Sequence, residues 1–128
     1  MKVLLDTHAF LWWITDDDQL STPAREAIRT RGNRVFVSAA SGWEIITKSR
    51  IGRLTLPQPV DGFIARHMEE NTFQPLSITI RHTFALEALP SLHRDPFDRM
   101  LIAQALAEEM PLVTGDQAIR AYPVSTIW

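Results

Sequence analysis

Short apolar runs recur along the chain, separated by longer segments in which apolar residues return every three or four positions. Runs of only a few apolar residues predict strands that are covered on both faces. In chain order they span residues 3–5, 35–37, 73–78, 112–114 and 124–127. Because Pro75 cannot donate a ladder hydrogen bond, the third strand is expected to be short or to lie near an edge of its sheet.

The segments between these runs have helical periodicity and hydroxyl residues at the expected caps, which are Thr7, Ser21, Ser38 and Thr79. The predicted helices cover residues 9–14, 24–30, 39–50, 59–68, 80–89, 96–109 and 117–121. Within 39–50, the spacing of Ala39 or Ala40, Trp43 and Ile46 predicts that these residues face the core.

Strands and helices therefore alternate along the whole chain, with no internal repeat, low-complexity tract or linker. This order predicts an α/β fold in which right-handed crossovers join about five short strands into a parallel sheet with helices on both faces. The length of 128 residues fits one domain, so a single domain over residues 1–128 is expected.

The segment 93–98, His-Arg-Asp-Pro-Phe-Asp, opens a helix that continues into the apolar stretch 100–107. Pro96 suits the first helical position, where its missing N–H is no loss, and Asp95 before it is a good N-cap. Asp98 then takes the third helical position, where a capping box also places an acid. The positive end of the helix dipole would face the same side as Asp98.

Acidic residues from four distant parts of the chain fall at one edge of the predicted sheet. Asp6 follows the first strand, Asp116 follows the fourth, Asp98 lies in the first turn of its helix, and Glu44 lies in the second turn after the second strand. Each alone has a structural interpretation, as a cap, a turn residue or a solvated helix position. Together they would repel one another and raise one another's pKa unless a cation neutralised them.

Oxygen ligands without cysteine or a paired-histidine motif suit a hard cation, so we expect Mg²⁺ or Mn²⁺ at this edge. Such an ion polarises a phosphate and lowers the pKa of an attacking water, which favours phosphodiester hydrolysis. Thr114 could orient a ligand or the water, and it could equally be an ordinary strand threonine.

Charge and composition narrow the possibilities further. With 13 basic and 15 acidic residues the net charge is −2, so the chain lacks the basic character of most nucleic-acid binders, and a bound cation would have to hold the phosphates. The absence of cysteine excludes disulfides and thiolate chemistry and fits a cytoplasmic location. No apolar run approaches the ~20 residues of a membrane span, and Asp6, Thr7 and His8 interrupt the apolar start, so neither a membrane association nor a signal peptide is expected.

The ordered set of motifs resembles the PIN domain of VapC-type toxins. The resemblance rests on Leu-Leu-Asp-Thr at 4–7, Trp-Glu-Ile at 43–45, the segment 93–105 and Leu-Val-Thr-Gly-Asp at 112–116. It implies a metal-dependent ribonuclease, the toxin of a bacterial toxin–antitoxin pair, usually a homodimer and silenced by a cognate antitoxin whose tail covers the site. The family's acidic quartet corresponds to Asp6, Glu44, Asp98 and Asp116, of which Asp6 and Asp98 match the most consistent metal ligands. Asp95 belongs to the motif of this subgroup, and its role as a cap or as a ligand stays open.

Other polar and aromatic residues are assigned less specific roles. His8 and His93 flank the acids and could act on a proton or a phosphate, but structural or surface roles are favoured for both. His67 and His82 are expected to lie away from the site. Possible RNA backbone contacts are Lys48, Arg50, Arg53, Arg94 and Arg99. Trp12 and Trp13 are expected in the core or on a dimer or antitoxin surface, whereas Trp43 and Trp128 are expected to pack in the core and at the terminus.

Two other classes of function remain to be compared with the nuclease. A receiver-type signalling domain would need an acid after its third strand and a late lysine, and the chain has no acid there and no lysine after Lys48. A PIN-like module that binds RNA or protein without cleavage is the stronger alternative, and the intact quartet argues against it. Neither a P-loop nor a GxGxxG motif is present, which excludes the common nucleotide-binding classes.

Overall fold

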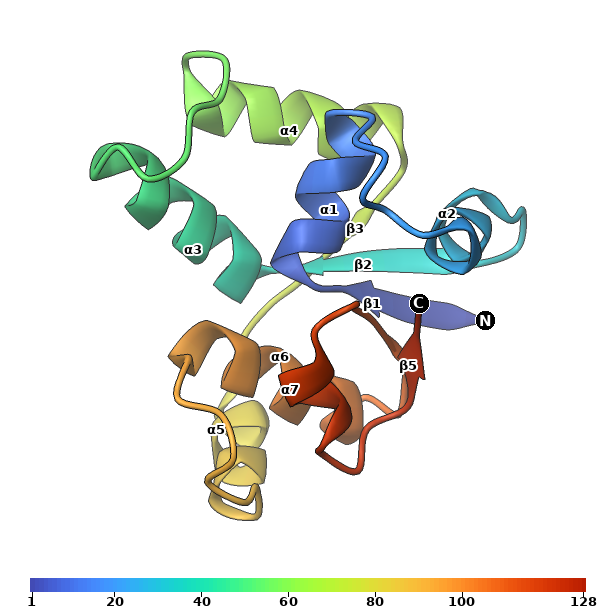
Figure 1. The fold of residues 1–128 in the computed structure, drawn as a ribbon, viewed down its shortest axis with the longest axis vertical. Coiled ribbons are helices and arrows are strands. Elements are labelled where there is room, and N and C mark those ends of the chain that lie inside the picture. Colours follow the sequence, from blue (N-terminus) through green and yellow to red (C-terminus); the bar gives the residue numbers. More distant parts are fainter.

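The computed structural model of the chain describes residues 1–128 and shows an α/β fold of five parallel strands and seven helices (Figure 1). The elements in chain order are β1 (Lys2–Leu5), α1 (Thr7–Ile14), α2 (Thr22–Arg29), β2 (Arg34–Ser38), α3 (Ala39–Arg50), α4 (Val60–Glu70), β3 (Gln74–Leu76), α5 (Ile80–Glu87), α6 (Pro96–Ala107), β4 (Leu112–Val113), α7 (Gln117–Arg120) and β5 (Thr126–Ile127). The predicted fold class is confirmed.

The sheet has the strand order β3-β2-β1-β4-β5, with β1 at its centre. Strand β1 pairs with β2 through Val3 and Val35, and with β4 through Leu5 and Val113. The chain moves outward from β1 to β3 and then returns to place β4 on the other side of β1. The strand order thus reverses between β1 and β4, and sheets of this kind bind ligands at such a point, outside the carboxyl ends of the strands.

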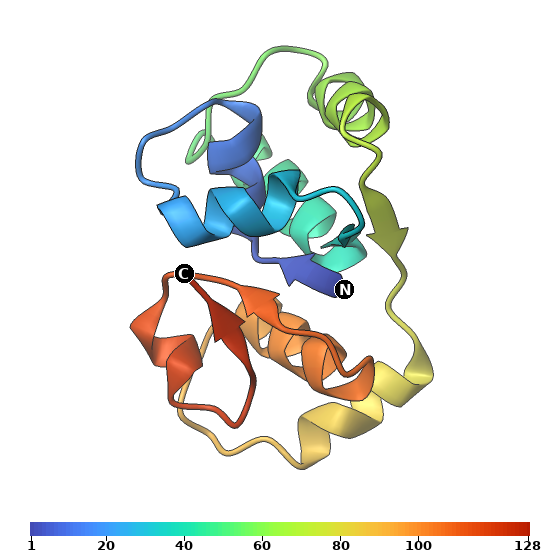
Figure 2. The same cartoon turned by 90° about the vertical axis from the view of Figure 1, so that its right-hand side faces the viewer.

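Two helical layers cover the sheet, with α1 to α4 on one face and α5 to α7 on the other (Figures 1 and 2). Alternate residues of β1 enter the two cores: Val3 and Leu5 pack with Phe10 of α1, whereas Leu4 packs with Leu101 and Ile102 of α6. Burial on both faces explains why β1, β2 and β4 appear in the sequence as apolar runs, whereas the edge strands β3 and β5 are only partly buried. Strand β3 contains Pro75 and lies at the edge of the sheet, as predicted.

Two details of the predicted helices are wrong. Helix α1 begins at Thr7 and its N-cap is Asp6, while the Thr7 hydroxyl donates to Ser41 Oγ at 2.9 Å and ties α1 to α3. In α3 the buried residues are Ala40, Ser41, Glu44 and Ile45, so Ala40 faces the core as predicted, whereas Trp43 and Ile46 are exposed.

Trp43 shows why the prediction for α3 failed. Its side chain is 63% exposed and packs edge to face on Phe97, with ring centroids 4.9 Å apart. The inner face of α3 is polar in part because Ser41 and Glu44 are buried there, so apolar periodicity could not locate it. Trp128 is half-buried against Trp12, with ring centroids 5.8 Å apart, which agrees with terminal packing. None of the seven helices has the length and apolarity that a membrane span requires.

Candidate active site

Asp6 occupies the carboxyl end of the central strand. Its Oδ1 accepts a hydrogen bond from Ala9 N at 2.7 Å, and its backbone N–H donates to Val113 O at 3.1 Å, so α1 and β4 both fix its position. The side chain is almost entirely buried, and this burial raises the pKa of the Asp6 carboxyl. Hydrogen bonds from the Thr114 hydroxyl and the Ala9 N–H oppose this rise in pKa.

Asp116 lies beyond the end of β4, on the other side of the strand reversal. Its Oδ1 accepts from Ala118 N at 2.9 Å and caps α7, while its N–H donates to Thr114 Oγ1 at 3.1 Å. Thr114 is fully buried and bonds to Asp6 as well. The Thr114 hydroxyl therefore links the two acids that follow the central strands.

Asp95 and Asp98, at the start of α6, have different roles. Asp95 Oδ1 accepts from Phe97 N at 2.8 Å and from Asp98 N at 3.1 Å, which confirms the prediction that Asp95 caps the helix. Asp98 has its side chain free for the site. Burial, together with the neighbouring charges of Asp95, Glu44 and Asp6, raises the pKa of Asp98 to about 7, against an opposing effect of His93.

His93 lies between two of the acids, a position that its expected structural or surface role did not include. Its Nε2 is 3.0 Å from Asp98 Oδ2 and 3.4 Å from Asp116 Oδ2, although the ring is not aligned for a hydrogen bond with either. Nδ1 accepts from Asp95 N at 3.2 Å, so the proton of the neutral ring belongs on Nε2, facing the carboxylates. The sequence signal was its place in the same segment as both helix-starting acids.

Glu44 is 3% exposed and so is not a solvated helix position. One carboxylate oxygen forms an ion pair with Lys48 on the next turn of α3, and the other, Oε1, has no hydrogen-bond partner. A buried carboxylate oxygen without a donor is costly, and such atoms in native proteins call for an explanation.

The structure places the four predicted acids at the same edge of the sheet, but they are not all equally close to one another. Ligand atoms of Asp98, Asp116 and His93 lie within 4.8 Å of one another. Asp6 and Glu44 lie close enough for their charges to raise the pKa of Asp98, although they are outside this close group. Burial, mutual repulsion and the unpartnered Glu44 Oε1 all fit a hard divalent cation, which would neutralise the cluster and supply the missing partner.

The other two histidines of the prediction, His67 and His82, lie away from the acids as expected, whereas Arg99 has a structural role that the sequence did not indicate. His67 packs on Phe63 in α4, and His82 is buried in a separate polar network, both away from the acids. Arg99 donates to Pro90 O at 3.0 Å and to the Tyr122 hydroxyl at 3.2 Å, so it holds the loop that precedes α6.

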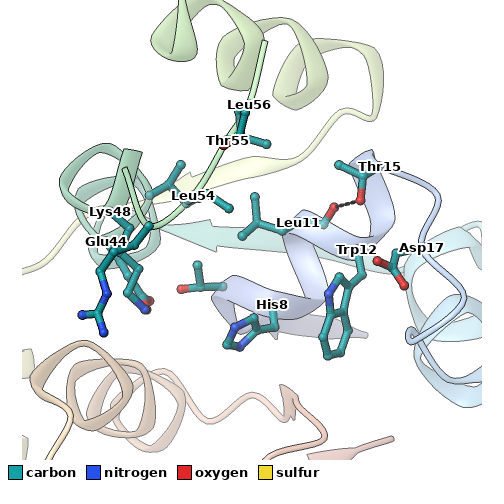
Figure 3. Close-up of a pocket in the computed structure, with 13 residues that line it drawn as sticks. His8, Leu11, Trp12, Thr15, Asp17, Glu44, Lys48, Leu54, Thr55 and Leu56 are labelled. Carbon is teal, nitrogen blue, oxygen red and sulfur yellow. Dashed lines mark hydrogen bonds and ion pairs between the residues drawn. The ribbon is translucent and has the colours of Figure 1, made fainter. Parts of the chain in front are cut away.

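Cavities adjoin the acidic edge on both sides of α1. One of about 470 Å³ lies between α1, α3 and the segment after α3, and Glu44, Lys48, His8 and Trp12 contribute to its lining (Figure 3). Another of about 420 Å³ is lined by Asp6, Asp116, His8, Trp12 and Trp128, among others.

Comparison with known proteins gives a consistent result. The sequence matches the family model for the PIN domain over residues 3–124. It is 32% identical over 131 aligned residues to Ribonuclease VapC22 of Mycobacterium tuberculosis, with 98% of each chain covered. It is also 34% identical over 59 residues to Ribonuclease VapC16 of the same organism, covering 46% of this chain and 42% of that relative.

Solved structures resemble the fold over nearly the whole chain. A chain of VapBC2 from Rickettsia felis, solved bound to a DNA fragment from its promoter, gives a TM-score of 0.74 at 14% identity, covering 98% of this chain and 97% of that one. A chain of VapBC-1 from nontypeable Haemophilus influenzae gives 0.63 at 18% identity, covering 98% and 96%. At these identities the structural likeness establishes the fold.

Proposed function

This chain belongs to the PIN-domain family, and from that premise we propose that residues 1–128 form one nuclease domain that cleaves RNA with the help of a divalent cation. The proposal extends to a biological role as the toxin of a type II toxin–antitoxin pair. The relative that covers nearly the whole chain is a ribonuclease by name, and the resembling structures are VapBC proteins.

The convergence of Asp6, Glu44, Asp98 and Asp116 on one edge of the sheet is the observation that carries the proposal. We assign all four as ligands or supports of the cation, with Asp6 and Asp98 as the central pair. Mg²⁺ or Mn²⁺ is the expected ion, because the donors are carboxylate oxygens. When bound, the ion supplies charge stabilisation at the phosphate and lowers the pKa of the attacking water.

The chain's own groups hold this arrangement in place. Asp95 and Pro96 fix the start of α6 and so the position of Asp98, and Thr114 holds Asp6. Lys48 restrains one oxygen of Glu44 and leaves the other, Oε1, without a hydrogen-bond partner and available to a cation. With its proton on Nε2, His93 presents a donor rather than a lone pair to the carboxylates of Asp98 and Asp116, so we do not assign it as a cation ligand.

Two protein partners are included in the proposal. A cognate antitoxin is expected because the resembling structures are VapBC proteins. A homodimer is supported by the exposed apolar residues Ile80 and Phe84 on α5, which are 68% and 69% exposed. A cytoplasmic location follows from an RNA substrate together with the absence of cysteine.

Cleavage of RNA by the purified protein tests the proposed function. The wild-type chain should cut single-stranded or structured RNA in Mg²⁺ or Mn²⁺, and excess chelator should stop the reaction. Asp6→Asn should abolish cleavage, while Asp18→Asn, at an exposed loop acid, should leave it intact. Full activity in chelator or in Asp6→Asn would refute the mechanism, and RNA binding without turnover in the wild type would favour the non-cleaving module.

A further inference from the structure

A row of three rings leads away from the acidic centre along α1 to the last residue of the chain. The centroids of His8 and Trp12 are 5.4 Å apart with their planes at 31°, and those of Trp12 and Trp128 are 5.8 Å apart with planes at 53°. His8 and Trp12 are four residues apart and so project from the same side of α1, as Figure 3 shows. We call His8, Trp12 and Trp128 the aromatic row.

The aromatic row borders open space rather than closed core. His8 and Trp12 line both cavities beside α1, and Trp128 lines the one that contains Asp6 and Asp116. His8 is exposed, and Trp12 and Trp128 are half-buried. The neighbouring Trp13 differs, because its indole N–H donates to Asn71 Oδ1 at 2.9 Å, whereas the indole N–H of Trp12 has no partner within the chain.

We propose that the aromatic row is a stacking platform for unpaired bases of the RNA next to the bond that is cleaved. This inference rests on the proposed function, and it names the substrate as single-stranded RNA at the site of cleavage. Rings that stack on bases are the common means by which proteins bind single strands without reading their sequence. The platform meets the acidic centre directly, since Asp6 and Asp116 share a cavity with all three rings.

The charged residues around the larger cavity indicate on which side the backbone and the bases of the bound strand lie. Arg53 lines this cavity, is exposed and takes part in none of the chain's ion pairs, so it is free to contact a phosphate. Asp17 lines the same cavity near Trp12, as Figure 3 shows, where an anion would be repelled. The backbone therefore passes on the Arg53 side while the bases turn toward Trp12.

The same charges argue for RNA over an acidic peptide as the occupant. Asp6, Asp17 and Asp116 all border the space beside the aromatic row, and they would repel carboxylate side chains. A nucleobase is neutral and presents a flat π face, so it can lie on Trp12 without that penalty.

Binding of a labelled single-stranded RNA of twelve nucleotides tests the platform, with an abasic strand of equal length as the comparison. The measurements are made in Mg²⁺ on an Asp98→Asn background, which prevents cleavage. The parent should bind the base-containing strand more tightly than the abasic strand. Trp12→Ala should weaken binding of the base-containing strand by at least about fivefold, the low end for one stacked base, and leave the abasic strand unaffected.

Further variants separate stacking from general effects. Trp12→Phe should recover most of the lost affinity because it keeps a ring, and Arg53→Gln should weaken both strands by a similar factor. Trp43→Ala is the matched control, since Trp43 is an exposed tryptophan outside both cavities. Unchanged RNA affinity in Trp12→Ala, or an equal loss in Trp43→Ala, would overturn the platform.

The proposed stacking platform and the proposed nuclease activity can be refuted independently of each other. If the wild type cleaves RNA and Trp12→Ala binds it as well as the parent does, the platform is refuted and the nuclease stands. If base-dependent binding requires Trp12 but the wild type never cleaves RNA, the platform stands and the nuclease is refuted.

Discussion

Helix α6 has polar groups in the interior at two places. The two places differ in whether those groups have hydrogen-bond partners within the chain. Near its middle, Gln104 is fully buried, but its amide accepts from Ser38 Oγ at 2.5 Å and donates to Ser77 O at 3.3 Å. His82 beside it accepts from Thr79 N at 3.0 Å and lies 2.9 Å from Glu108 Oε2. We call these residues the Gln104 network, and its polar atoms have partners.

At the start of the same helix the acids are not satisfied in this way. Asp98 has a pKa raised to about 7 by burial and by its acidic neighbours, and Glu44 Oε1 has no partner. A buried polar cluster in which every atom has a hydrogen-bond partner stabilises a fold. A cluster that contains polar atoms without partners indicates a ligand-binding site. Mutations in the two clusters should therefore have opposite effects on the stability of the chain.

Asp98→Asn should give the largest effect and should separate activity from stability. Loss of a central cation ligand removes several kcal/mol of charge stabilisation, so cleavage should fall by at least about 100-fold. Without metal at pH 8, the same variant should unfold at a higher denaturant concentration than the wild type, because a repelled charge is gone. RNA cleavage assays and urea titrations in chelator measure the two effects, and a destabilised metal-free variant would contradict this account of Asp98.

Gln104→Leu should show the reverse behaviour. It removes the hydrogen bonds of Gln104 with Ser38, Ser77 and His82 and leaves the buried Ser38 hydroxyl without its acceptor, so the free energy of unfolding should fall by about 2 to 3 kcal/mol. Cleavage per folded molecule should change less than tenfold, because Gln104 touches none of the four acids. Gln58→Leu, at an exposed position, serves as the control, and a stable but inactive Gln104→Leu would place the network inside the site.

The pH dependence of stability sharpens the contrast at the acidic edge. The pKa of Asp98 is about 7 in the folded chain and near 3.8 in the unfolded chain, so between these values the folded state binds more protons. Stability of the metal-free protein should therefore fall as pH rises from about 4 to 7, by about 1 to 2 kcal/mol after allowance for solvent screening.

Thermal unfolding in chelator across that pH range measures the fall, and Asp98→Asn should flatten it. Mg²⁺ should raise the unfolding temperature more at pH 8 than at pH 5.5, because protons compete with the ion for the carboxylates. An equal effect of Mg²⁺ at both pH values would place the binding elsewhere.

Features set by local sequence signals could be predicted, and features set by contacts between distant elements could not. Strands buried on both faces and hydroxyl or acidic caps are local signals, so the order of elements and the cap role of Asp95 were predictable. The inner face of α3 was not, because it contains the buried polar residues Ser41, which bonds to Thr7 of α1, and Glu44, so apolar spacing does not mark it. The position of His93 depends on the loop held by Tyr122 and Arg99, which no local pattern in the chain encodes.

Thr114→Val should give the smallest effect, at the group that joins the two acids following the central strands. Valine keeps the shape but removes the hydroxyl that bonds to Asp6 and accepts from Asp116 N at 3.1 Å. Without that bond the pKa of Asp6 should rise further, so the Mg²⁺ concentration for half-maximal cleavage should increase about tenfold, as for other supports of metal ligands. Thr114→Ser keeps the hydroxyl and should restore the wild-type value. A Thr114→Val chain that is destabilised but has an unchanged Mg²⁺ requirement would show that Thr114 belongs with the satisfied polar groups of the Gln104 network rather than with the acidic edge.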